Sequence, residues 1–263
     1  MGVITLLSAL IAFRFEEPHS TQPSIIQVVQ PRIQLCTLIR VKRVSLSILN
    51  YCFVVVALLI LEPILSLKLS SDYSFSPLQI SASFAFLFVA NVIGTSICLL
   101  LPQKLDKRRI ILATNFTLIV GLLLTGPSRL LRFPDKPAVL LTGLGVTGFS
   151  VGVSQTLSVV EAVSGGVSHF PSEDASVSEG VSKLLNGMSG VILLVGPPLS
   201  SLLNRHLGFS RTVDCLWILA TLFYIFLAIF TFQDLRRSSI AALDASREQE
   251  EEEEESLIKP NLK

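Results

Sequence analysis

The sequence predicts an all-α, polytopic membrane protein with a bundle of six transmembrane helices. Six apolar stretches of roughly membrane-crossing length follow one another between Ser45 and Phe232. A bilayer core of about 30 Å needs about 20 apolar residues in a helix, and only helices or closed barrels satisfy the backbone there. The stretches lack the strict alternation of barrel strands. They comprise residues 45–67, 78–101, 110–126, 138–163, 181–203 and 212–232.

The composition excludes several classes of function. Only 16% of the residues are charged and the mean hydropathy is +0.64, so whole segments are apolar rather than striped as in a soluble protein. The net charge of +1 provides no basic surface for nucleic acid. The four cysteines share no C-x-x-C spacing and the three histidines are scattered, so we expect no metal site and no cofactor.

Short segments flank the membrane domain, which we place at residues 45–233. Residues 1–13 are apolar but too short to span, and no basic residue precedes them, so a signal peptide is disfavoured. They can be the end of a truncated transmembrane helix. Residues 14–44 form a polar, proline-punctuated linker, and residues 164–179 a Ser/Gly/acidic loop. The acidic tail at 234–263 has the composition of a disordered segment.

The basic residues predict an orientation. With six spans and both termini on one side, 15 of the 21 Lys and Arg residues fall on the side of the termini. Cytoplasmic loops of membrane proteins carry such an excess. We therefore expect both termini, the linker and the tail in the cytoplasm.

Glu62 is the strongest candidate for a functional residue, since it lies inside the first apolar stretch. A carboxylate there costs roughly 2.5–3.5 kcal/mol on insertion scales, and such residues mark ion pathways and proton relays. Pro63 follows it and removes a helical hydrogen bond, so a kink can form beside the carboxyl group. This pair suits a carrier that exchanges a proton for a cation. Alternatively, Glu62 lies near the far interface and is solvated.

Other polar residues within spans are candidates for the same pathway. Glu161 closes the fourth stretch, where it either lines the cytoplasmic mouth of a pathway or marks the end of the helix. Asn91 and Gln155 either face a cavity or bond to a neighbouring helix, and the second is the default.

Glycine motifs in the spans indicate close packing. Residues 143–148 spell G-x-G-x-x-G, but a dinucleotide site needs a preceding strand, which an apolar span does not supply. Gly148 and Gly152 form G-x-x-x-G, which lets helices approach closely. In the fifth span, Gly187, Gly190 and the Gly196-Pro197-Pro198 sequence indicate close contacts and a kink.

A charged turn joins the second and third spans. Its residues are Asp106, Lys107, Arg108 and Arg109, which fix the orientation by positive charge or act as a cytoplasmic latch. In the latch, Asp106 pairs with a basic group or caps the next helix. Asn115 begins a glycosylation sequon, but we expect it to be unused because it falls within a span.

The tail carries a sorting pattern. Glu253 lies four residues before Leu257 and Ile258, a spacing that resembles the acidic dileucine signal read by clathrin adaptors. It favours an endosomal, lysosomal, vacuolar or vesicle membrane.

In order and spacing these motifs resemble the C-terminal half of a major facilitator superfamily transporter, most closely the vesicular amine and polyamine transporters. Residues 61–67 (LEPILSL) look like the acidic-proline motif of the seventh helix. Residues 106–109 look like the loop between helices eight and nine, and Gly196-Pro197 resembles the Gly-Pro of helix eleven.

The resemblance implies a function. It is proton-coupled antiport of a cationic amine or another small organic solute by a multi-pass carrier. A homodimer or a missing N-terminal half would complete the substrate path. A non-transporting scaffold or regulatory subunit is the alternative. The sequence offers no nucleophile–base pair, so we do not expect an enzyme.

Overall fold

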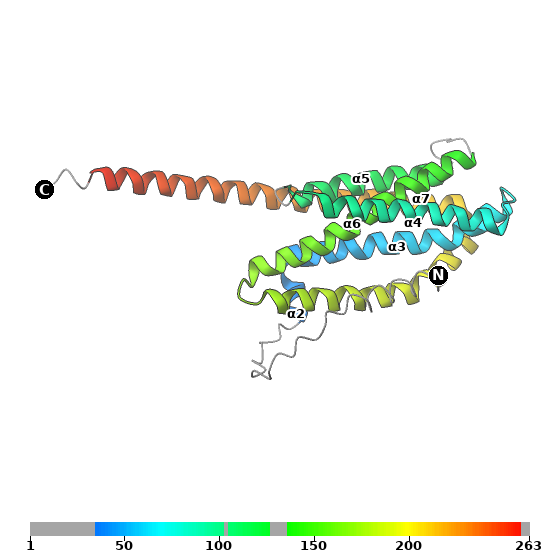
Figure 1. Cartoon of the computed structure of the whole chain (residues 1–263), viewed down its shortest axis with the longest axis horizontal. Helices are drawn as coiled ribbons and strands as arrows, with labels where there is room; N and C mark the ends of the chain where they lie inside the picture. Colours follow the sequence, from blue (N-terminus) through cyan, green and yellow to red (C-terminus); the bar gives the residue numbers. More distant parts are fainter. Residues whose placement is uncertain (1–34, 103–104, 127–135, 259–263) are drawn as a thin grey trace, which may run out of the picture. The chain divides into compact units, whose positions relative to one another are not determined.

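The structure, a computed structural model, describes residues 35–102, 105–126 and 136–258, with side chains described as far as Asp234. The chain divides into residues 1–32 and 33–263, and the first unit, with the predicted helix end at 1–13 and most of the linker, lies outside the described residues. The second unit is helical throughout its regular structure (Figure 1), which confirms the all-α prediction. Its elements are α2 (Leu35–Arg40), α3 (Lys42–Ser71), α4 (Pro77–Leu100), α5 (Lys107–Thr125), α6 (Pro137–His169) and α7 (Asp174–Ile258).

Among the described residues, five helices are long and apolar enough to cross a membrane. The fifth, α7, is broken at Gly208, where φ is 75° and ψ is 170°. That backbone conformation is open to glycine because it has no Cβ. The break divides α7 into a first arm (residues 174–207) and a second arm (residues 209–258). The six predicted stretches therefore correspond to α3, α4, α5, α6 and the two arms.

The first arm runs parallel to α3. Ser189 lies against Tyr51 with 3.3 Å between the hydroxyl oxygens, and the Ser200 hydroxyl donates to the Ile60 carbonyl at 2.8 Å. Residue numbers thus rise together along the two helices.

The second arm runs in the opposite direction along α3. The rings of Phe53 and Phe223 stack with centroids 4.3 Å apart, whereas Lys68 lies 4.8 Å from the ring centroid of Phe209. Together the arms cover two sides of α3 (Figure 1).

Two predictions about where helices end differ from the structure. The predicted loop at 164–179 is wrong apart from residues 170–173, because α6 continues to His169 and α7 begins at Asp174. Glycines permit this extension: a Cβ at Gly165 would meet the Arg43 side chain at 2.8 Å. The tail, expected to be disordered, continues the α7 helix to Ile258. Its Glu, Ala, Arg and Leu residues are strong helix formers, which favours continuation of the helix.

The G-x-x-x-G pair packs α6 against α4. A Cβ at Gly148 would overlap the Leu87 carbonyl oxygen, and one at Gly152 would overlap the Asn91 carbonyl oxygen. These glycines therefore bring two backbones into contact, as predicted.

The glycines of the first arm behave differently from one another. A Cβ on Gly196 would lie 3.1 Å from Cβ of Leu59, which is a close contact. Gly187 and Gly190 have nothing within 4 Å of such a Cβ, so the predicted close contacts there are wrong. The described helix also continues through Pro197 and breaks instead at Gly208.

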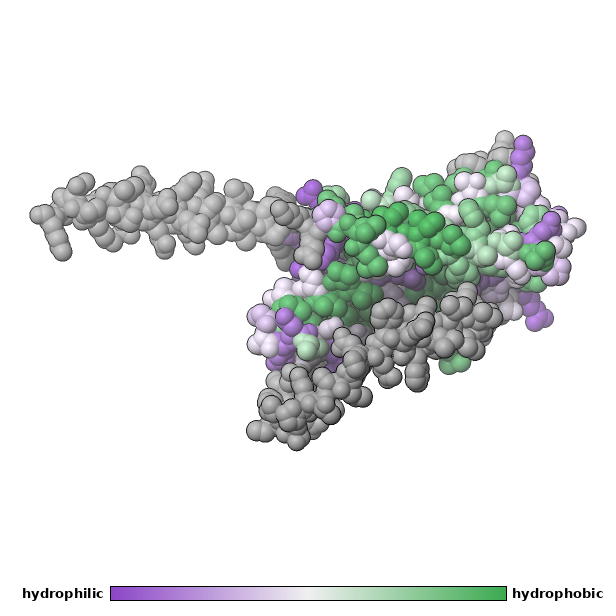
Figure 2. Space-filling model, viewed as in Figure 1, coloured by the Kyte–Doolittle hydropathy of each residue, from purple (hydrophilic) through white to green (hydrophobic). Residues whose placement is uncertain are grey.

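The apolar core joins α3, α5, α6 and the second arm around buried residues such as Leu61, Leu122 and Leu144. In the most apolar windows of α4 and α7 only 22% and 17% of residues are buried, against 44% in α3. Figure 2 shows hydrophobic residues gathered over α4 and hydrophilic ones toward the ends. Such surfaces are stable only against lipid or further protein.

Candidate functional site

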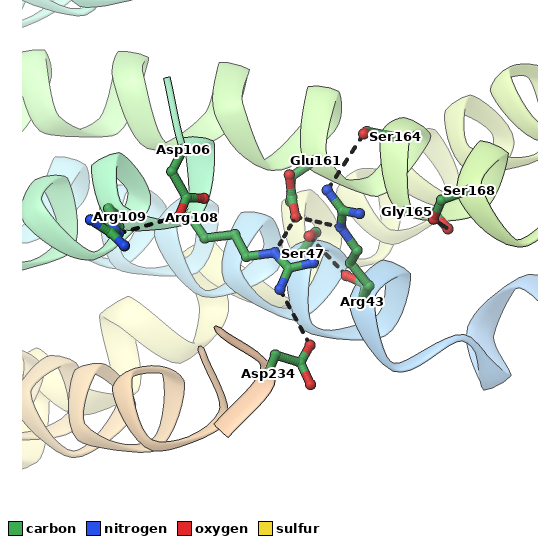
Figure 3. Close-up of polar contacts among 10 residues, drawn as sticks. All are labelled: Arg43, Ser47, Asp106, Arg108, Arg109, Glu161, Ser164, Gly165, Ser168 and Asp234. Atoms are coloured by element: carbon green, nitrogen blue, oxygen red, sulfur yellow. Dashed lines mark hydrogen bonds and ion pairs between the residues drawn. The ribbon is translucent and has the colours of Figure 1, made fainter. Parts of the chain in front are cut away.

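A buried carboxylate, Glu161 on α6, joins three helices (Figure 3). Its Oε1 atom accepts a hydrogen bond from Nε of Arg43 on α3 at 2.6 Å and from Nε of Arg108 on α5 at 2.8 Å. Only 4% of the Glu161 side chain is exposed. One carboxylate oxygen therefore holds two guanidinium groups at this end of the bundle.

One further residue, Asp234, completes this charge cluster, which we define as Arg43, Arg108, Glu161 and Asp234. Nη1 of Arg108 lies 3.5 Å from Oδ2 of Asp234 on the second arm, and Nη2 of Arg43 lies 3.5 Å from the Ser164 hydroxyl oxygen. The cluster contains two positive and two negative side chains. All four belong to this one bundle, so the cluster fixes α3, α5, α6 and the second arm to one another.

The predicted charged turn contributes only Arg108 to the cluster. Asp106 occupies the N-cap position of α5 but makes no capping hydrogen bond, and its Oδ2 lies 3.3 Å from Nε of Arg109. Of the two predicted roles, Asp106 thus pairs with a basic group. Lys107 makes no ion pair within the described part of the chain.

A network of buried amide and hydroxyl groups lies further inside the bundle. Nδ2 of Asn50 donates to the hydroxyls of Ser154 and Ser158 at 3.0 and 2.8 Å. Nδ2 of Asn115 donates to Oδ1 of Asn50 at 2.9 Å. Asn115 is 3% exposed, so its sequon is inaccessible in the folded bundle, and its Oδ1 has no hydrogen-bond partner among the described residues.

The charge cluster and the amide network are related by helix geometry. Seven residues are nearly two turns of α-helix, which places both members of a pair on one face about 10 Å apart. Each of the three helices repeats this spacing, in the pairs Arg43 and Asn50, Arg108 and Asn115, and Ser154 and Glu161. The same three faces therefore meet twice, once through charges and once through neutral polar groups.

A small cavity of about 40 Å³ adjoins the charge cluster and reaches Asn50 of the amide network. Arg43, Asn50, Arg108, Glu161 and Asp234 are among its lining residues. It has room for water but not for an organic solute. This cavity is therefore not a substrate site.

Of the predicted pathway residues, Glu161 belongs to the charge cluster, and the others do not. Glu62, Asn91 and Gln155 are each partly buried, on α3, α4 and α6. No hydrogen bond or ion pair to the Glu62 side chain occurs among the described residues. α3 continues through Pro63. Glu161 does not mark a helix end, because α6 extends two turns beyond it.

The predicted sorting residues lie beyond the described side chains. Glu253, Leu257 and Ile258 belong to the last turns of α7.

Comparison with known families decides the class. The model of the sugar (and other) transporter family matches residues 2–235. The chain belongs to this family of major facilitator transporters. No curated protein matches the sequence. Family membership and the apolar helices make this a multi-pass membrane protein of a transporter class, with a small molecule as substrate and the bilayer as its surroundings. The bundle is one half of a major facilitator fold.

Proposed function

We propose that the protein is a proton-coupled secondary transporter that exchanges protons for a cationic amine or another small organic solute. The observation that carries this proposal is the position of Glu62. Glu62 is partly buried, lies about two-thirds of the way along the apolar helix α3, and has no side-chain partner among the described residues. A carboxyl group in that setting is available to a proton or to a cationic substrate.

Glu62 and Glu161 differ in a way that supports separate roles. Two arginines already neutralise Glu161, whereas Glu62 has no arginine or lysine bound to it among the described residues. We assign proton and substrate exchange to Glu62, with Pro63, Asn91 and Gln155 along the same pathway. Glu161, placed near the mouth, holds the helices together.

The charge cluster supports a rigid-body mechanism. Major facilitator halves rock around a central site as units. The cluster ties α3, α5, α6 and the second arm at one end, so these helices can move together. Among the residues of the charged turn, Arg108 is the one that belongs to the charge cluster. The excess of basic residues favours the cytoplasmic face for this end. Gly196 and Pro197 would admit bending of the first arm on the other flank of α3.

Location and assembly complete the proposal. Glu253, Leu257 and Ile258 favour sorting by a clathrin adaptor to an acidic organelle, where a proton gradient drives antiport. A second copy or an N-terminal half would supply the other wall of the path.

Uptake into reconstituted vesicles tests this function. The full chain is placed in vesicles with an acidic interior, and uptake of labelled polyamine and monoamine is followed. Accumulation that disappears when an ionophore dissipates the pH gradient would support the proposal. Accumulation that survives the ionophore would argue against proton coupling.

A further inference from the structure

A long apolar groove runs along α3 between the two arms of α7. Its volume is about 590 Å³. On α3 the lining residues recur every three or four positions, through Ser45, Leu49, Cys52, Val56 and Ile60. The first arm contributes residues such as Met188, and the second arm residues such as Phe223. The groove is thus lined by α3 and by both arms.

The lining demands an apolar occupant. Among the described residues that line it, none is charged, and Ser45 and Cys52 are the polar or weakly polar exceptions. Ser45 and Ile60 are 15 residues apart, about 22 Å along the helix, which exceeds the roughly 15 Å of hydrocarbon in one leaflet. An elongated, apolar chain matches these dimensions better than a compact polar solute.

One end of the groove is basic. Lys42 precedes Ser45 by three residues on the same face of α3 and is exposed. Arg40, also exposed, follows Ile39, which lines the groove. Arg43 is occupied by Glu161, and Lys183, next to the groove residue Leu184, pairs with Glu179. Lys42 and Arg40 are exposed and are not held by the charge cluster. Each basic residue near an anionic membrane surface strengthens binding about fivefold.

We propose that the groove binds an anionic phospholipid, with one acyl chain along α3 between the arms and its phosphate at Lys42 and Arg40. The apolar groove is complementary to the acyl chain of that lipid, and its cationic end is complementary to the phosphate. This lipid would fill the space between the arms and fix their spacing. This lipid site requires only that the protein lies in a membrane, and it is independent of which solute the protein transports.

Tryptophan reporters test the site directly. Trp217, the single tryptophan of the chain, is replaced by Phe, and a reporter is introduced by Leu49→Trp in the groove or Leu222→Trp on the second arm. Both leucines are exposed, at 45% and 60%, so either position accepts the larger ring. The full chain is reconstituted in vesicles in which either phosphatidylserine or phosphatidylcholine carries brominated acyl chains, which quench tryptophan on contact.

At equal lipid fraction, quenching of the Leu49→Trp reporter should show a preference of about 25-fold for the brominated anionic lipid, since two basic residues each contribute about fivefold. The Leu222→Trp reporter should show no preference. Adding Lys42→Gln should lower the preference at Leu49→Trp about fivefold. Arg205→Gln, which removes an exposed cation near the Gly208 break, should leave it unchanged.

Three results would overturn the proposal. They are equal quenching by the two lipids at Leu49→Trp, a preference that is undiminished in Lys42→Gln, and a groove reporter that neither lipid reaches. The last would show that protein, such as a second copy of the chain, fills the groove.

Discussion

Arg108 on α5 and Glu161 on α6 lie 53 residues apart in the sequence and 2.8 Å apart between Nε and Oε1. The same carboxylate oxygen accepts from Arg43 at 2.6 Å. Because both guanidinium groups depend on one acceptor, the cluster should be sensitive to the loss of that single charge.

Glu161→Gln should therefore destabilise the bundle by about 2–3 kcal/mol, since two partly buried guanidinium groups lose their carboxylate. Asp234→Asn is the matched control. The Asp234 side chain is 37% exposed and its contact is 3.5 Å long, so its loss should cost less than about 1 kcal/mol. Urea unfolding in detergent micelles, followed by circular dichroism, measures both. Equal losses in the two variants would contradict the central role of Glu161.

Gly152→Ala should disrupt the contact between α4 and α6. The added Cβ would overlap the Asn91 carbonyl oxygen, which belongs to the backbone and cannot turn away. Overpacking of this kind costs about 1–3 kcal/mol.

Gly187→Ala tests whether the contact, rather than glycine itself, explains that loss. No atom lies within 4 Å of a Cβ at Gly187, so this variant should be neutral or gain up to about 1 kcal/mol from helix propensity. Thermal unfolding in the same detergent compares the pair. A Gly152→Ala protein as stable as the parent would refute close packing.

Asn50 and Asn115 should prove energetically coupled. Asn50→Leu or Asn115→Leu alone leaves a buried polar group unpaired and should cost about 1–3 kcal/mol. The double variant removes both partners of their shared hydrogen bond, so its loss should fall short of the sum by about 1 kcal/mol. A double-mutant cycle of urea unfolding gives this coupling, and strict additivity would show that the bond contributes nothing.

Alanine at both Leu257 and Ile258 should move the protein from internal membranes to the cell surface, because the adaptor signal would be lost. Ile240→Ala changes another apolar residue of the same tail and serves as the control. Surface biotinylation in cells expressing the full chain measures the redistribution. Unchanged surface levels would leave the dileucine interpretation without support.

The spans were predictable from the sequence because the need to satisfy the backbone in hydrocarbon acts locally, on about 20 residues at a time. The ends of α6 and α7 were not, because Gly165 fits against Arg43, more than 100 residues away in the chain. Such contacts are tertiary and leave no periodicity within one segment.

The site was predictable only in part, for the same reason. Glu161 and Arg108 stood out as charges, but their partner Arg43 lay in the presumed linker and Asp234 at the start of the presumed tail. A signal was present in the seven-residue spacing from arginine to asparagine on both α3 and α5. It becomes meaningful only once the two helices are known to face α6.

The most direct test of the account is pH-driven uptake by Glu62→Gln in vesicles, compared with Glu179→Gln, which makes the same change at an exposed glutamate. If Glu62 exchanges the proton, Glu62→Gln should lose accumulation against a gradient while Glu179→Gln retains it. Both variants should be present at the level of the parent. Undiminished pH-driven accumulation by Glu62→Gln would contradict the account.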